Sequence, residues 1–359
     1  SIAYIMKKNR VSLGIFSIAV DYLQILALLS ATKTPWPKVI LTLYTWLSAF
    51  NFNINITAPE CAFELAYEDK WRMILIMPGF LFVAVIVYNY TRTFLNKVVL
   101  NKHGKDIYAH THKSFGMVVT IMYYIYLSLS MTALEVFNCS LVELEDPLTG
   151  EIVSDGKQYM SETNWVCYEE GSLQVTLIPY AIGALGFYTL GYPAFCAAVL
   201  LNKKNAMLAR EDQILRAADK GFSKRDNPHC WEFRQSYGKL YYYFKPSKWY
   251  WVLVVLFRKF AIATISLMFR ANATFQMCMI VLAIFCSSVF QVKNQPYMSM
   301  SEREEVLKDH SEALGVVTAE IDRRRGQSTV AKKKQFKLGE ASAYEATQKV
   351  AEYIWNYNT

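Results

Sequence analysis

The sequence predicts an all-α fold, a polytopic membrane bundle of about seven transmembrane helices. Residues 249–293 contain two apolar runs of roughly twenty residues, the length a helix needs to cross the hydrocarbon core of a bilayer. Only the short segment 270–273 separates them, which is typical of a tight helical hairpin. Further apolar runs precede this hairpin, and the chain of 359 residues is 53% hydrophobic, so the bilayer is the expected solvent.

Seven apolar segments emerge when hydrophobicity is averaged over a window of about 19 residues. They cover residues 11–30, 37–56, 71–95, 114–137, 173–201, 250–269 and 274–292. The second segment is the weakest, because Asn51, Asn53 and Asn55 dilute its end. The predicted organisation is a juxtamembrane segment over 1–10, a membrane domain over 11–293 and a cytoplasmic helical tail over 294–359.

The charges of the connections predict the orientation. Residues 138–172 carry eight carboxylates and one lysine, whereas 202–249 is rich in lysine and arginine. Because lysine and arginine gather on the cytoplasmic side, we expect an outer loop over 138–172 and a cytoplasmic loop over 202–249. Seven crossings then place the N-terminus outside and the C-terminus in the cytoplasm. Lys7, Lys8 and Arg10 oppose this assignment, since they would flank the first helix on its outer side.

Glycosylation sequons agree with that orientation. Asn55, Asn138 and Asn272 begin sequons in connections assigned to the outside, where such sites can be modified. A fourth sequon, at Asn89, lies at the cytoplasmic end of its segment and should remain unmodified. Glycans are therefore predicted at the first three positions. The predicted location of the protein is the plasma membrane or another membrane derived from the secretory pathway, including the ciliary membrane.

Three cysteines lie in connections assigned to the outside: Cys61, Cys139 and Cys167. A disulfide between Cys139 and Cys167 would staple the acidic outer loop. Cys61 could take either partner or pair with an upstream ectodomain, and three free thiols are the remaining alternative.

Three ionisable residues interrupt the apolar segments at similar depth: Asp21, Arg258 and Lys259. Each costs about 2.5–3.5 kcal/mol near the bilayer centre, so each requires an explanation. An ion pair between Asp21 and one of the two basic residues, acting as a gate or latch, is the sharper hypothesis. The alternatives are that the basic side chains snorkel to the inner headgroups, or that the pair only holds the bundle together.

The fifth segment contains five residues that favour a bend or close packing, and they form a predicted hinge: Pro179, Gly183, Gly186, Gly191 and Pro193. Proline removes a backbone hydrogen bond, and glycine lets helices approach closely. Before the sixth segment, lysines and tryptophans are typical of a lipid interface. These residues are Lys239, Lys245, Lys248, Trp249 and Trp251.

No P-loop, GxSxG, HExxH or GxGxxG motif occurs, so nothing in the sequence supports an enzyme. His110-Thr111-His112 lacks the spacing and supporting cysteine of a metal site, and no metal or cofactor is expected. The basic residues lie in connections, which argues against a nucleic-acid partner. The expected partners are membrane lipids, extracellular structural proteins or an upstream ectodomain, and a cytoplasmic partner for the tail.

Several motifs resemble a known module: residues 58–61, 67–71 with Pro78, 137–139, 239–244, 258–259 and 295–297. Over residues 21–297 the chain resembles the C-terminal TRP-like membrane region of large cell-surface proteins from algae, oomycetes and other protists. It is more distantly similar to the fungal TRP-like and polycystin families. The resemblance implies a cysteine-rich extracellular region upstream, and it also implies a cation channel. However, a TRP pore needs a re-entrant loop between its last two spans, and residues 270–273 are too few.

The sequence therefore predicts a non-enzymatic cell-surface membrane protein that anchors or senses through an extracellular assembly. A TRP/polycystin-like cation channel subunit is the first alternative. A heptahelical G-protein-type receptor is the second, although no DRY triplet follows any apolar segment.

Overall fold

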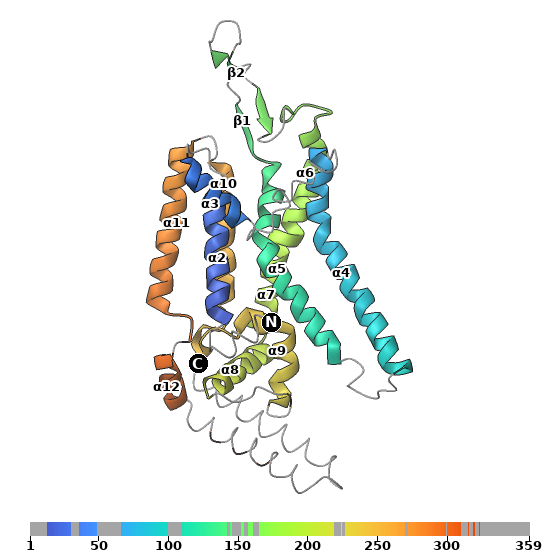
Figure 1. Ribbon diagram of the computed structural model, residues 1–359, viewed down its shortest axis with the longest axis vertical. Coiled ribbons are helices and arrows are strands. Elements are labelled where there is room, and N and C mark those ends of the chain that lie inside the picture. The colour runs from blue at the N-terminus through green and yellow to red at the C-terminus, as the bar shows by residue number, and fades with distance from the viewer. Residues whose placement is uncertain are drawn as a thin grey trace. The chain divides into compact units, whose positions relative to one another are not determined.

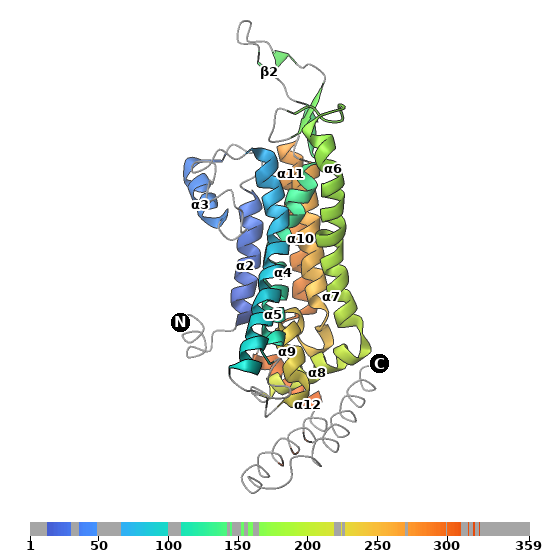
Figure 2. The same ribbon diagram turned by 90° about the vertical axis from the view of Figure 1, so that its right-hand side faces the viewer.

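The computed structural model describes residues 13–29, 36–48, 66–99, 109–141, 144–145, 152–153, 157–160, 165–218, 224, 227–269, 272–298, 300–309, 315, 319 and 323. This part of the chain is mostly helical (Figures 1 and 2). It divides into two compact units, which we describe separately. Unit 1 draws on residues 1–84, 121–194 and 255–292, and unit 2 on residues 85–120, 195–254 and 293–359.

Five helical segments in the described residues are long and apolar enough to cross a membrane, and by this criterion the chain is a membrane protein. They are α4 (Tyr67–Val98), α5 (Ala109–Glu135), the continuous segment of α6 (Leu173–Ala184), η5 (Leu185–Leu190) and α7 (Gly191–Leu201), α10 (Trp251–Met268) and α11 (Ala273–Asn294). These helices correspond to the last five apolar segments that the sequence predicts.

The structure describes only part of the first two predicted spans. Helix α2 (Leu13–Leu29) has 17 residues, about 25 Å, which is the lower limit for a transmembrane helix. The described helix α3 (Lys38–Ser48) has 11 residues and is about 16 Å long, which is less than the thickness of the hydrocarbon core. It lies beside one end of α2 (Figure 2). The remainder of the second predicted span, residues 49–56, lies outside the described residues.

In unit 1, α2 runs parallel to α5 and α10 (Figure 1). Asp21 of α2 contacts Tyr123 of α5 and Lys259 of α10. Further along the same three helices, one apolar cluster joins Ile25, Leu28, Leu127, Ile262 and Ala263. Residue numbers thus increase together along all three helices. The predicted seven-span arrangement requires α2 to run opposite to α5 and α10, so the structure differs from that expectation.

Helices α4 and α6 pack on α5 within unit 1. Trp71 of α4 donates through Nε1 to the carbonyl oxygen of Thr132 at 2.8 Å. Beyond α5 and before α6, the chain forms two short antiparallel pairs (Figure 1). These are β1 (Cys139–Leu141) with β4 (Gln158–Met160), and β2 (Leu144–Glu145) with β3 (Ile152–Val153).

The predicted hinge contains a π-helical turn, η5, between α6 and α7. The backbone N–H of Gly191 donates to the carbonyl of Gly186, five residues earlier, as a π-helix requires. The glycines do not mediate close packing, however, because a Cβ at Gly183 or Gly186 would meet no heavy atom within 4 Å. The backbone irregularity lies where the sequence predicts it, but the close helix contact predicted there is absent from these glycines.

In unit 2, most of the connection 202–249 is helical rather than a loop. It contains α8 (Lys203–Ala217), α9 (Pro228–Tyr241) and the short η6 (Pro246–Lys248). Helix α12 (Met300–Asp309) packs on α8, and Arg303 donates from Nε and Nη2 to the carbonyl of Ala217 at 3.1 and 2.9 Å. Gly116 of α5 lies directly against the backbone of α9 at Gln235.

Candidate functional site

The first candidate site is a buried ion pair in unit 1. Lys259 Nζ lies 2.8 Å from Asp21 Oδ1 and donates to Gln24 Oε1 at 3.0 Å. Tyr123 donates through its hydroxyl to Asp21 Oδ2 at 2.6 Å, and its ring centroid lies 4.2 Å from Lys259 Nζ. Lys259 is 0% exposed and Asp21 is 2% exposed. Both charges are therefore removed from solvent and matched by each other and by polar neighbours.

The orientation of Gln24 explains how this arrangement is maintained. Its Nε2 donates to the carbonyl oxygen of Tyr124 at 2.9 Å, which turns Oε1 toward Lys259. The sequence analysis gives Arg258 and Lys259 as candidate partners of Asp21, and in the structure Lys259 is the one that contacts it. Arg258 instead lies with its guanidinium 5.6 Å from the ring centroid of Tyr22. The arrangement can hold three helices together, and it can act as a latch if the pair opens.

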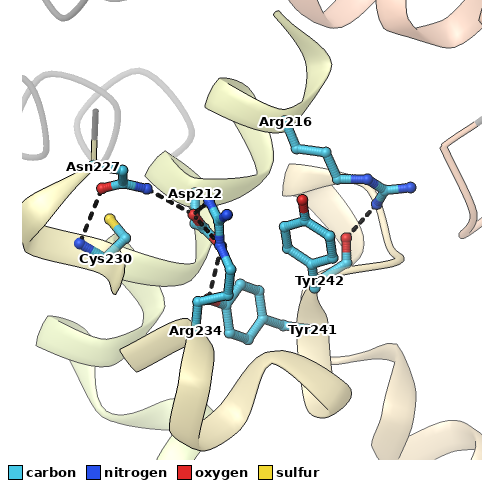
Figure 3. A network of polar contacts seen from close by, with 7 residues as sticks. All are labelled: Asp212, Arg216, Asn227, Cys230, Arg234, Tyr241 and Tyr242. Atoms are coloured by element: carbon cyan, nitrogen blue, oxygen red, sulfur yellow. Dashed lines mark hydrogen bonds and ion pairs between the residues drawn. The ribbon is translucent and has the colours of Figure 1, made fainter. Parts of the chain in front are cut away.

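The second candidate site surrounds Asp212 on α8 (Figure 3). Arg234 of α9 holds both carboxylate oxygens, with Nε at 3.0 Å from Oδ1 and 2.8 Å from Oδ2 and with Nη2 on Oδ1. Asn227 Nδ2 donates to Oδ1 at 2.8 Å, and the Tyr241 hydroxyl donates to Oδ2 at 2.9 Å. The Asp212 side chain is 0% exposed. Burial raises the pKa of this carboxyl, while Arg234 and the other donors lower it.

Local sequence explains how α9 is positioned for this contact. The Asn227 side chain accepts a hydrogen bond from the Cys230 backbone N–H at 3.0 Å, and Pro228 opens the helix. Asparagine before proline is a favourable helix start, because it satisfies an N–H that the first turn leaves without a partner. One residue therefore both caps α9 and binds Asp212.

The ring of Tyr242 lies between two guanidinium groups (Figure 3). Its centroid is 5.0 Å from Arg216 and 4.9 Å from Arg234, so both arginines can make cation–π contacts. Arg216 also donates to the Tyr242 carbonyl oxygen. Burial lowers the pKa of Arg216, which these contacts partly offset. The network thus extends from the buried carboxylate to the aromatic end of α9.

Glu211 precedes Asp212 and is also buried, with 3% of its surface exposed. Burial, followed by the charge of Asp212, raises the pKa of Glu211 to about 8, although a hydrogen bond with Cys230 acts in the opposite direction. The carboxyl is therefore protonated at neutral pH. Burial likewise raises the pKa of the Cys230 thiol, so this cysteine is a poor nucleophile.

Glu211 should make the stability of unit 2 depend on pH. A pKa raised from 4.5 to about 8 by folding means that the contribution is fully present below pH 4.5 and is lost as pH rises toward 8. The full difference is on the order of 5 kcal/mol. We expect Glu211→Gln, which stays neutral, to raise the melting temperature at pH 8 but not at pH 4.5. An equal effect of the variant at both values would contradict the prediction.

Arg234→Met should destabilise unit 2 by about 3–5 kcal/mol, because it leaves the Asp212 charge buried without its partner. Adding Asp212→Asn should recover part of this loss. Arg216→Met is the matched control on α8, and its expected cost is about 1 kcal/mol because its main contacts are with an aromatic ring and a carbonyl. Thermal denaturation of the wild-type chain and the three purified variants measures the difference.

The predicted lipid-interface residues lie largely within unit 2. Trp249 is 8% exposed and Trp251 is 2% exposed, so both side chains are largely covered by the rest of the chain. The Arg210 guanidinium lies 5.8 Å from the Trp249 ring centroid. The lysines Lys239, Lys245 and Lys248 are half-buried, and Lys248 Nζ donates to Asn294 Oδ1 at 3.0 Å. This segment therefore packs against protein, because its aromatic residues fill the space around α8.

The predicted disulfide joins Cys139 and Cys167, whose Cα atoms are 6.3 Å apart. Cys61 and Asn55 lie outside the described residues. Of the other two sequons, Asn138 is half-buried and directly precedes the disulfide. Asn272 is exposed, and its Oδ1 accepts a hydrogen bond from the Phe275 N–H at 3.1 Å at the start of α11.

The polar network on α8 and α9 was not predicted from the sequence. Adjacent carboxylates in a strongly basic connection, together with the Asn227-Pro228 helix start, were the available signals. In the described residues no group of three or more His, Cys, Asp or Glu side chains is arranged to hold a metal ion. Comparisons with family models, curated proteins and solved structures find no match to this chain.

Proposed function

We propose that the chain is a non-enzymatic membrane protein of the cell surface, which anchors or senses an extracellular assembly through residues 138–172. The supporting observation is that residues 138–172, which we call the excursion, are tied to both neighbouring spans, α5 and α6. The disulfide links the chain just after α5 to the chain just before α6. Gln174 of α6 donates to the carbonyl oxygen of Val136 at 3.2 Å. A force on the excursion therefore acts on both helices, instead of only extending a loop.

The proposed topology has six crossings, with the residues before α2 in the cytoplasm. Loop charges favour a cytoplasmic start for α5 and α10, and α2 runs parallel to both. Lys7, Lys8 and Arg10 then lie on the cytoplasmic side, which removes the exception that seven crossings create. Helix α3 would rest at the outer interface with its exposed apolar residues in lipid. These residues are Val39, Leu41, Leu43 and Trp46.

A membrane-impermeant amine reagent tests this topology on intact cells. Lys157 is the only lysine of residues 138–172 and should be labelled, whereas Lys203 should react only after permeabilisation. Six crossings predict that Lys7 and Lys8 are also protected in intact cells. Seven crossings predict that both are labelled, and peptide mass spectrometry distinguishes the two results.

Lateral mobility tests the proposed function. The wild-type chain should diffuse slowly at the cell surface, and a variant in which residues 142–164 are replaced by a glycine-serine linker should diffuse several times faster. Equal mobility with normal surface delivery would count against anchoring. Ion flux through liposomes containing the chain would instead favour the channel alternative.

A further inference from the structure

Two aromatic side chains are exposed on a single turn of the excursion. The aromatic turn, residues 165–171, follows β4 and leads into α6. Trp165 is 50% exposed and Tyr168 is 64% exposed, on either side of the disulfide-bonded Cys167. Tryptophan and tyrosine dominate the binding energy of protein interfaces when they project from a rigid surface.

The backbone of the aromatic turn is fixed at several points in addition to the disulfide. The hydrogen bonds are Met160 N to Trp165 O at 3.0 Å, Cys167 N to Gln158 O at 2.8 Å and Tyr168 N to Gln174 Oε1 at 3.0 Å. Gln174 is itself 0% exposed, so the turn is attached to the buried part of α6. A partner would meet a preorganised surface and would lose little affinity to ordering it.

Tyr168 adopts a left-handed backbone conformation, with φ at 60°. This conformation costs a residue other than glycine about 1–3 kcal/mol, whereas glycine adopts it freely. Because the Tyr168 ring is mostly exposed, its packing within the chain offsets little of this conformational free energy. The ring is therefore held in an exposed position by a backbone that the Gln174 side chain fixes.

The net charge of the excursion, counted from its sequence, selects the partner. Residues 138–172 carry eight carboxylates and one lysine, and that lysine, Lys157, already pairs with Glu169 at 2.7 Å. Glu170 is exposed beside Tyr168. Aromatic faces next to carboxylates bind ammonium and guanidinium groups, and the negative potential repels acidic proteins and anionic lipid.

We propose that the aromatic turn is a docking site for a lysine- or arginine-rich polypeptide segment of an extracellular partner. This inference rests on the cell-surface function proposed above and names the chemistry of its partner. The rings of Trp165 and Tyr168 would make cation–π contacts with the lysine or arginine side chains of the partner. The carboxylates of the excursion would supply the long-range electrostatic attraction.

The full chain in phosphatidylcholine nanodiscs provides the test, with a fluorescent lysine-glycine peptide as the probe and fluorescence polarisation as the readout. Trp165→Ala and Tyr168→Gly should each weaken binding about tenfold. Glycine suits the backbone at position 168, so weaker binding by Tyr168→Gly cannot be attributed to misfolding. Trp46→Ala is the matched control, because Trp46 on α3 is 76% exposed and lies outside the excursion. It should leave peptide affinity unchanged, and a glutamate-glycine peptide should not bind.

Two results would overturn the proposal. In the first, both aromatic variants bind the peptide as tightly as the wild-type chain, so that the attraction is due to charge alone. In the second, brominated lipid quenches the Trp165 fluorescence, measured as the difference from Trp165→Phe, so that the turn is a lipid anchor. Both faces of a nanodisc are accessible, so peptide binding does not depend on topology. Labelling of Lys157 on intact cells reports separately on the proposed function.

Discussion

Gly116→Ala should separate α5 from α9 and cost unit 2 about 3 kcal/mol or more. A Cβ at position 116 would overlap the carbonyl oxygen of Gln235 and would lie 3.0 Å from the carbonyl carbon of the same residue. Both atoms belong to the backbone of α9, so no side chain can rotate to relieve the clash. Thermal denaturation and hydrogen exchange in α9 should both show the loss.

Gly79→Ala and Gly183→Ala are the matched controls for this substitution. Both glycines lie in apolar helices, and a Cβ there would meet no heavy atom within 4 Å. Alanine should stabilise these helices slightly, by about 0.5–1 kcal/mol, because it loses less conformational entropy than glycine. If Gly116→Ala were as stable as the controls, the close contact between α5 and α9 would be refuted.

Breaking the pair between Asp21 and Lys259 should produce the other large effect. Asp21→Asn leaves the ammonium of Lys259 buried without a counter-charge, and Lys259→Met leaves the carboxylate in the same position. Each single variant should lose about 3–5 kcal/mol, because removing one partner exposes the desolvation cost of the other. The double variant should be more stable than either single variant, since it buries no charge.

A double-mutant cycle in thermal denaturation measures this coupling, and surface delivery provides a second readout. Costs that simply add would mean that the two charges do not interact. The cycle also separates the two functional hypotheses for the pair. A latch predicts that the folded double variant loses its response to the extracellular assembly, whereas a structural tie predicts a normal response.

Several features could be predicted from the sequence because they depend on local composition. An uninterrupted apolar run must form a helix in lipid, so the last five spans follow from hydropathy alone. Charges within such runs are costly, which marked Asp21 and either Arg258 or Lys259 as partners, and the structure selects Lys259. The pairing of Cys139 with Cys167 was expected because both lie in the same connection between two apolar segments.

Other features could not be predicted because they depend on contacts between distant residues. Hydropathy does not show that α2 runs parallel to α5 and α10, which follows from contacts between residues of the three helices. Helices α8 and α9 are polar, and their stability comes from contacts such as Arg234 with Asp212, which no sequence spacing specifies. The close approach at Gly116 likewise depends on where α9 lies.

The sequence by itself determined that this chain is a membrane protein, because transfer of long apolar runs into lipid outweighs every other local preference. It also identified the charges within the apolar runs as residues that needed a partner. Only the tertiary structure decided which partner each one takes, that α2 runs parallel to α5 and α10, and that the basic connection folds around Asp212. The relative direction of the helices and the pairing of side chains arise from packing between segments far apart in the chain. Neither can be predicted from amino-acid composition.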